Sequence, residues 1–62
     1  MGNVDKVFAQ IETRALTPQE ISYRSGFSVE KVRKVLDFLE DFDFVKKEGP
    51  KYRVTDEVAA LP

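Results

Sequence analysis

Hydrophobic residues near the start of the chain recur with a helical period. The apolar positions are Val4, Val7, Phe8 and Ile11. Spacings of three and four residues place such side chains on one side of an α-helix. The pattern predicts an amphipathic helix over about residues 4–13, with Asn3 as its N-cap.

A second, shorter helix is predicted from its terminal residues. Thr17 suits the N-cap, Pro18 suits the first turn, and Glu20 stands three residues after the cap, as in a capping box. Gly26 favours the left-handed conformation that ends a helix. The second helix is therefore predicted over about residues 18–24.

A third, longer helix follows at once. Ser28 is placed as its N-cap, and the helix is predicted over about residues 29–42. Its apolar side chains form one broad stripe, which comprises Val29, Val32, Val35, Leu36, Leu39 and Phe42. Its opposite side is charged and comprises Glu30, Arg33, Lys34, Asp37 and Asp41. We expect the stripe to face the core and the charged side to face solvent.

The helical period ends after residue 42. Residues 45–47 and 51–54 have the pattern of two short strands, and the Glu48-Gly49-Pro50 sequence between them favours a turn. A β-hairpin is therefore predicted over about residues 45–54, with Tyr52 in the core. The spacing of the five phenylalanines also predicts that nearly all of them lie in the core. The five are Phe8, Phe27, Phe38, Phe42 and Phe44.

The composition indicates one small domain spanning residues 1–62. Apolar residues make up 42% of the chain and charged residues 34%, which allows a core but no second domain at this length. The absence of cysteine and histidine excludes disulfides, thiolate or imidazole metal sites, and cysteine or histidine catalysis. We therefore expect no cofactor, no metal and no catalytic residue.

The chain carries no sign of membrane targeting. Its first residues lack the basic and apolar regions of a signal peptide, and no apolar run approaches the length that spans a bilayer. We expect a cytoplasmic protein with no membrane partner.

Charge is unevenly distributed, although the net charge is only −1. Residues 14–34 and residues 46–53 each carry a net charge of +3. Between them lie four acidic residues, Asp37, Glu40, Asp41 and Asp43. The third helix is thus basic near its N-terminus and acidic near its C-terminus, which opposes the helix macrodipole and costs at most about 0.3 to 1 kcal/mol per charge. Contact between its first half and phosphate groups would offset this cost.

Two helices joined by a glycine turn, the second followed by a hairpin, resemble the winged helix-turn-helix DNA-binding domain of transcription regulators. The resemblance covers about residues 16–55 and rests on Leu16-Thr17-Pro18-Gln19-Glu20-Ile21, Ser22, Gly26-Phe27-Ser28, Val32, Val35-Leu36, Leu39, Phe44-Val45 and Tyr52-Arg53-Val54-Thr55. It implies an α+β, mainly α fold with three helices and a C-terminal β-hairpin wing. Many relatives have a glycine near Asp43, where a left-handed residue ends the third helix.

The resemblance also implies sequence-specific DNA binding by a small transcription regulator that is not an enzyme. The third helix would enter the major groove of double-stranded DNA, and the wing would hold the phosphate backbone beside it. The DNA-binding residues it implies are Thr17, Gln19, Ser28, Glu30, Lys31, Arg33, Lys34, Lys46, Lys47 and Lys51.

Other interpretations remain open. The charged side of the third helix could be a solvated surface joined by local ion pairs, Glu30 with Lys34 and Arg33 with Asp37. The hairpin lysines could serve to keep an edge strand from pairing with other chains. A winged helix could also bind protein within a larger transcription or replication assembly, which suits a net charge of −1.

We further expect a homodimer. The apolar stripe of the first helix and the apolar tail at residues 58–61 offer more hydrophobic surface than so short a core obviously covers. Pairing through these surfaces would place two third helices in successive major grooves, about 34 Å apart, and would raise the affinity for DNA.

Overall fold

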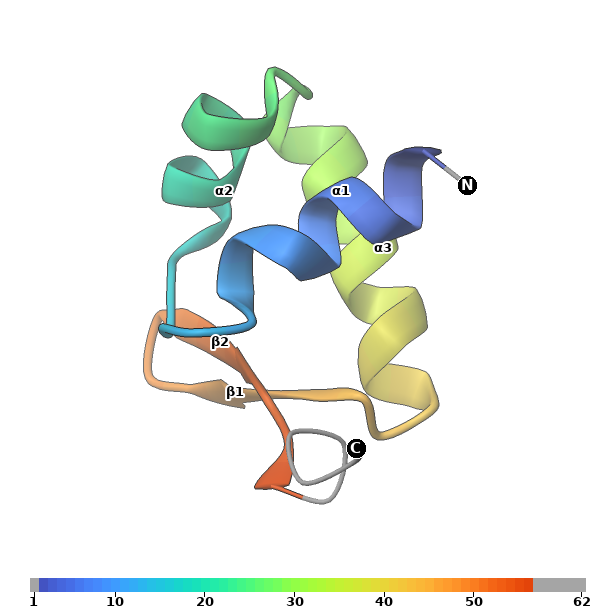
Figure 1. Ribbon diagram of the computed structural model, residues 1–62, viewed down its shortest axis with the longest axis vertical. Coiled ribbons are helices and arrows are strands. Elements are labelled where there is room, and N and C mark those ends of the chain that lie inside the picture. The colour runs from blue at the N-terminus through green and yellow to red at the C-terminus, as the bar shows by residue number, and fades with distance from the viewer. Residues whose placement is uncertain (1, 57–62) are drawn as a thin grey trace.

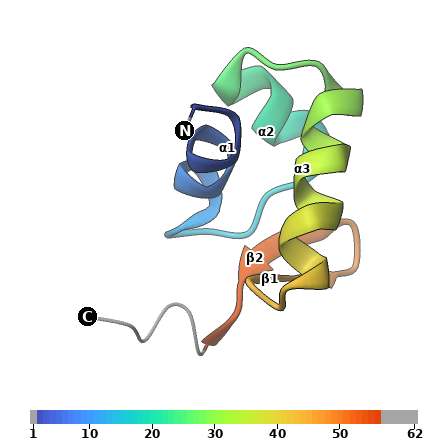
Figure 2. The same cartoon turned by 90° about the vertical axis from the view of Figure 1, so that its right-hand side faces the viewer.

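Three helices precede a two-stranded β-hairpin in the computed structural model, which describes residues 2–56. The elements are α1 (Gly2–Ile11), α2 (Pro18–Ser25), α3 (Val29–Asp41), β1 (Val45–Glu48) and β2 (Lys51–Val54). Figure 1 shows α1 crossing in front of α3, with α2 near the top and the hairpin below. In Figure 2, α1 and α3 face each other above the hairpin. The predicted fold class is confirmed: the chain is an α+β, mainly helical winged helix-turn-helix with a C-terminal wing.

The first helix begins and ends earlier than its pattern predicts. It spans Gly2–Ile11, so Asn3 lies inside the helix and is not its N-cap. The chain leaves the helix after Ile11, bends through residues 12–14, and pairs with β2 at Leu16. The Leu16 N–H donates to the Tyr52 carbonyl at 3.0 Å, and the Tyr52 N–H donates to the Leu16 carbonyl at 2.8 Å. Buried backbone groups need such partners, so this pairing limits the length of α1.

The residues at both ends of α2 act as predicted. The Thr17 hydroxyl accepts the Glu20 N–H at 3.1 Å, and the Glu20 carboxylate accepts the Thr17 N–H at 2.8 Å, which completes the capping box. Pro18 occupies the first turn, where its missing N–H is not needed. The helix ends at Ser25, one residue beyond the predicted limit, and Gly26 follows in the left-handed conformation with a φ of 81°.

The capping box makes the stability of α2 depend on pH. The Thr17 N–H holds the pKa of Glu20 below its ordinary value, because it donates to the charged carboxylate. A carboxyl with a lowered pKa stabilises the folded state above its unfolded pKa and loses this contribution as the pH falls through the folded pKa. We therefore expect Glu20→Ala to lower the melting temperature most at neutral pH and progressively less in acid. A difference in melting temperature that stays constant across the acid range would contradict this expectation.

Three serines set the turn between α2 and α3. The Ser22 hydroxyl donates to the Phe27 carbonyl, and the Phe27 N–H donates to the Ser25 hydroxyl at 3.2 Å. Ser28 is the N-cap of α3, as predicted, and its hydroxyl accepts the Lys31 N–H at 3.1 Å. These bonds determine where α3 starts relative to α2.

The third helix ends one residue before its predicted limit. Asp43 adopts the left-handed conformation with a φ of 61°, and its N–H donates to the Glu40 carbonyl at 3.0 Å. The Phe44 N–H donates to the Leu39 carbonyl at 2.9 Å, so the two bonds form a Schellman motif. The Thr55 hydroxyl donates to the Asp43 carbonyl at 2.9 Å and ties the turn to the end of the wing. An aspartate thus occupies a conformation that glycine adopts more easily.

The core consists of aliphatic side chains and one tyrosine. Its buried residues are Val7, Ile11, Leu16, Ile21, Val32, Leu36, Leu39, Val45, Tyr52 and Val54. The prediction for Tyr52 is confirmed, whereas the prediction for the phenylalanines is wrong. Phe8 and Phe27 are only partly buried, and the other three are exposed. Phe42 stands at the C-cap, so the helical stripe that predicted its burial stops before reaching it.

The apolar stripe of α1 faces this core. Val7 and Ile11 are fully buried, and Val4 and Phe8 pack partly against the core. Val7 and Ile11 therefore have no surface left to offer to a second copy, and within this stripe only Val4 and Phe8 keep some exposed surface. The other surface expected at that interface, residues 58–61, lies outside the described residues.

Candidate nucleic-acid interface

The register of the wing decides which of its lysines face the helices. Lys47 pairs with the buried Tyr52, two residues along β1 from the buried Val45. Side chains two residues apart lie on the same face of a strand, so Lys47 shares the face that packs on the helices. Lys46 and Glu48 lie on the opposite, outer face.

A groove lies between the start of α2, the first half of α3 and the wing. It has a volume of about 210 Å³ and is lined by Pro18, Gln19, Arg33, Lys47, Pro50 and Tyr52. Arg33 and Lys47 give it two positive charges, and no carboxylate from residues 2–56 lines it. We call this site the basic groove.

Tyr52 is a buried member of the basic groove and is only 7% exposed. Burial raises the pKa of its phenol, and the charges of Glu40 and Asp37 raise it further, whereas Arg33 lowers it. The phenol therefore stays protonated at neutral pH. It keeps an O–H group that can donate to an anionic ligand.

The first half of α3 presents its charged side to solvent, as predicted. Glu30, Arg33 and Lys34 are all exposed. In the part of the chain that the structure describes, no ion pair joins Glu30 to Lys34 or Arg33 to Asp37. The interpretation of this side as a surface joined by local pairs therefore loses its main support. Arg33 and Lys34 are placed to contact an external anion.

Lys31 lies on a different side of α3. Its ammonium is 4.7 Å from the centre of the Phe27 ring, and the ammonium of Lys6 in α1 is 5.5 Å from the same ring. Both distances are typical of cation–π contacts. Lys31 is thus engaged beside α1, and the structure does not bring it together with Arg33 in the basic groove.

Two of the predicted DNA contacts are also capping residues. The hydroxyls of Thr17 and Ser28 each accept a backbone N–H, but a hydroxyl retains an O–H that can donate to phosphate. Gln19 is exposed and lines the basic groove with Arg33. Thr17 precedes the groove residues of α2 directly, whereas Ser28 stands at the start of α3.

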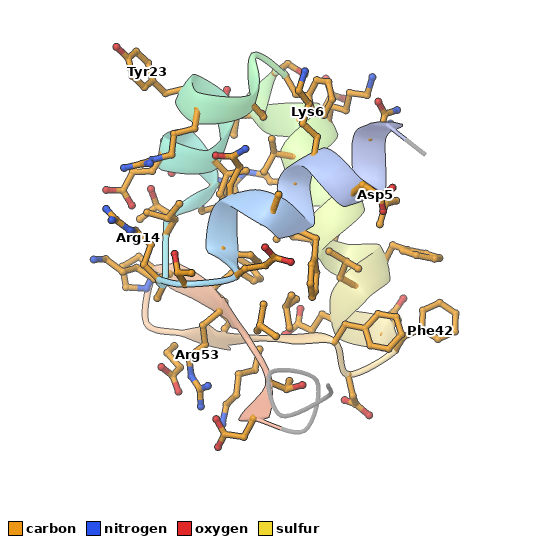
Figure 3. The ribbon with its side chains drawn as sticks, in the orientation of Figure 1. Asp5, Lys6, Arg14, Tyr23, Phe42 and Arg53 are labelled. Atoms are coloured by element: carbon orange, nitrogen blue, oxygen red, sulfur yellow. The ribbon has the colours of Figure 1, made fainter. Side chains whose placement is uncertain are left out.

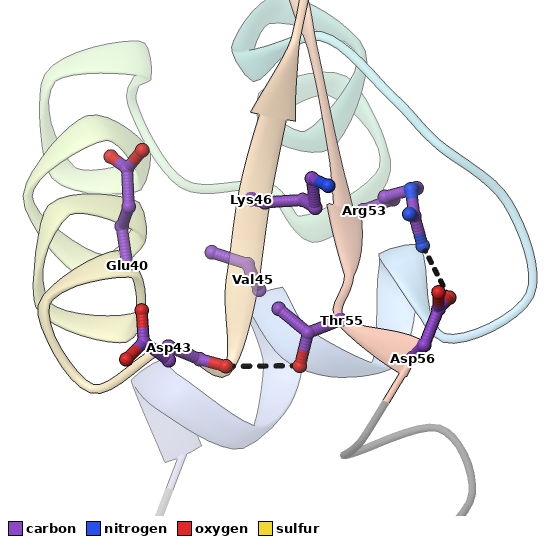
Figure 4. A pocket seen from close by; sticks show the side chains of 7 residues that line it. All are labelled: Glu40, Asp43, Val45, Lys46, Arg53, Thr55 and Asp56. Atoms are coloured by element: carbon purple, nitrogen blue, oxygen red, sulfur yellow. Dashed lines mark hydrogen bonds and ion pairs between the residues drawn. The ribbon is translucent and has the colours of Figure 1, made fainter.

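The outer face of the wing is largely neutralised by its own neighbours. Arg53 contacts Glu48 at 2.8 Å and Asp56 at 3.0 Å, and Lys46 lies 4.0 Å from Glu48. Figure 4 shows Lys46 and Arg53 at a second pocket, of about 520 Å³, whose other charged residues are carboxylates. Lys46 is therefore set apart from the basic groove. Lys51 stands opposite Glu48 in the strand register and lies on the same outer face of the wing.

Among residues 2–56, no group of three or more acidic side chains is placed to hold a metal ion. No helix in that range is long and apolar enough to cross a membrane.

Comparisons with known proteins bear on the fold. No protein-family model matches the chain, and no curated protein matches it. The chain is similar to a solved structure, PigF with SAH, with a TM-score of 0.79 over 97% of this chain and 17% sequence identity. The match covers 20% of that structure's chain. At this level of identity the likeness concerns the fold alone.

Proposed function

We propose that the protein is a sequence-specific DNA-binding protein that acts as a small transcription regulator in the cytoplasm. The observation that carries the proposal is the basic groove, where Arg33 of α3, Lys47 of the wing and Gln19 of α2 meet without a lining carboxylate from residues 2–56. A polyanion that crosses these elements is neutralised by both cations and releases its counterions. The backbone of a DNA duplex is such a polyanion.

In this proposal the N-terminal half of α3 enters the major groove. Arg33 and Lys34 donate to guanine edges or phosphates, and Glu30 accepts a hydrogen bond from a cytosine amino group. Lys47 in the wing and Gln19 at the start of α2 donate to phosphate oxygens and position the helix. The proposal assigns the protein no catalytic step and no cofactor.

The affinity for duplex DNA is expected to fall steeply with salt. If three or four cations contact phosphates, the affinity should fall roughly a hundredfold between about 50 and 200 mM salt. Fluorescence anisotropy with a labelled random-sequence duplex measures this slope. A duplex that stays unbound at the lower salt concentration, or that binds without salt dependence, would overturn the proposal.

A protein-binding role has support from a different observation. Three phenylalanines, one in the C-terminal half of α3 and two just beyond its end, are exposed, and contiguous exposed apolar surface often marks a protein contact. A winged-helix module of a larger transcription or replication assembly would use that surface. It would leave duplex DNA unbound in the salt titration, so one experiment separates the two functions.

A further inference from the structure

Three phenylalanine rings form an exposed aromatic cluster beside the C-terminal half of α3. Phe38, Phe42 and Phe44 are 48%, 57% and 42% exposed. The rings of Phe38 and Phe42 meet edge to face with centres 4.9 Å apart, and those of Phe42 and Phe44 stack with centres 6.1 Å apart. Figure 3 shows the Phe42 ring projecting from the molecule near the lower end of α3. The three rings thus present one continuous apolar surface to water.

The aromatic cluster lies on a different side of α3 from the basic groove. Arg33 and Phe38 are five residues apart, which at about 100° per residue places them about 140° apart around the helix. A ligand in the basic groove therefore leaves the aromatic cluster uncovered. A partner that covers the cluster is therefore distinct from a ligand in the basic groove.

Opposite charges flank Phe38, the first ring of the aromatic cluster, along α3. Lys34 stands four residues before Phe38, and Asp41 stands three residues after it. These spacings place both charges next to Phe38 on the surface of the helix. Within residues 2–56, neither Lys34 nor Asp41 has an ion-pair partner.

We propose that the aromatic cluster binds a second copy of this chain, with the two α3 helices antiparallel about a two-fold axis near Phe38. A two-fold axis brings the same surface of both copies together. Residues before Phe38 in one copy then lie opposite residues after Phe38 in the other. Lys34 meets the partner's Asp41, and the reverse contact forms by symmetry. This pairing engages Lys34 and therefore competes with the DNA contact proposed for that side chain, whereas the basic groove lies on another side of α3.

The order of charges along α3 favours a second copy over other occupants. Of the charged residues of α3, Lys34 in the first half and Asp41 in the second half are both placed next to Phe38 by their spacing. In an antiparallel pair, each Lys34 lies against an Asp41 of the other copy, so this surface is complementary to itself. The same contact also offsets part of the electrostatic cost of placing basic residues near the N-terminus of α3 and acidic residues near its C-terminus, which opposes the helix macrodipole.

The exposed area indicates how strong the pairing is. A phenylalanine side chain contributes about 150 to 250 Å², so three half-exposed rings offer about 300 Å² per copy. A stable interface buries about 800 Å² per partner. The dimer is therefore expected to be weak and reversible, and to dissociate on dilution.

Sedimentation equilibrium without nucleic acid tests the pairing separately from the proposed function. Over a range from about 10 µM to 1 mM, where weak interfaces associate, the unmodified protein should shift from monomer to dimer. Lys34→Glu and Asp41→Lys each create two like-charge contacts and should each raise the dimer dissociation constant at least about fivefold. Mixed in equal amounts, the two variants should associate as well as the unmodified protein, because their heterodimer regains two opposite-charge contacts.

Lys47→Glu is the matched control, because it makes the same charge change in the basic groove and should leave self-association unchanged. Phe42→Ser should abolish the dimer while a cooperative thermal melt shows that the fold is kept. The proposal is overturned if the unmodified protein stays monomeric at the highest concentration. It is also overturned if the mixture of charge variants associates no better than each variant alone.

Discussion

Leu36→Ala is expected to leave the protein largely unfolded at room temperature. Leu36 lies in the middle of α3 and is fully buried in the core. Its truncation costs about 2 to 5 kcal/mol, from the lost burial and from the cavity that remains. A domain of about sixty residues has roughly 3 to 5 kcal/mol of stability to lose. The substitution therefore removes most of the free energy of folding.

Phe38→Ala is the matched control on the same helix. The Phe38 ring is 48% exposed, so its truncation opens no enclosed cavity and should cost about 1 kcal/mol. Circular dichroism during heating and during urea titration, at low protein concentration, compares the two variants. If Leu36→Ala melted cooperatively near the temperature of the unmodified protein, Leu36 could not hold the place in the core that the structure gives it.

Local chemistry suffices to predict the helix ends around the turn between α2 and α3. Thr17, Gly26 and Ser28 each bond to backbone groups three or four residues away, so no knowledge of the remaining fold is required. The end of α1 depends instead on the pairing of Leu16 with Tyr52. These two residues are distant in the chain, and no local pattern indicates their contact.

The phenylalanines show where helical periodicity stops being informative. Phe42 continues the apolar stripe of α3 in sequence, but the left-handed Asp43 turns the chain away after the C-cap. The wing then supplies Val45 and Val54 to the core. Because a protein interior is close-packed, it holds only a limited number of side chains. The phenylalanine rings near the C-terminal end of α3 therefore remain on the protein surface.

Gln19, Arg33 and Lys47 of the basic groove were predicted as DNA contacts, whereas the groove itself was not predicted and Tyr52 was expected only in the core. Lys46 and Lys47 are adjacent and chemically alike, and in the sequence only the two-residue spacing from the apolar Val45 indicates that Lys47 faces the helices. The pairing of Lys47 with Tyr52 decides the matter, and a slip of one residue would exchange the two lysines. The surroundings of Lys31 were also not predictable from the sequence, because its contact with Phe27 depends on how the turn before α3 folds.

Reversing both charges of the basic groove, with Arg33→Glu and Lys47→Glu together, is expected to lower the affinity for duplex DNA at least hundredfold, which is about 2.8 kcal/mol. Each substitution removes a phosphate or base contact and adds a carboxylate that repels the backbone. The slope of log affinity against log salt should become shallower by about two. The fold should be retained, because both side chains are exposed and neither has an ion-pair partner within residues 2–56.

Lys6→Glu combined with Lys46→Glu is the matched control, because it changes the net charge equally at sites outside the basic groove. Lys6 lies on α1 over the Phe27 ring, and Lys46 lies on the outer face of the wing. Fluorescence anisotropy with the same duplex, at one salt concentration, compares the two double variants. The control should lose less than about fivefold in affinity, through its more negative net charge. Equal losses in the two double variants would show that binding follows net charge alone, in which case the basic groove does not hold the duplex.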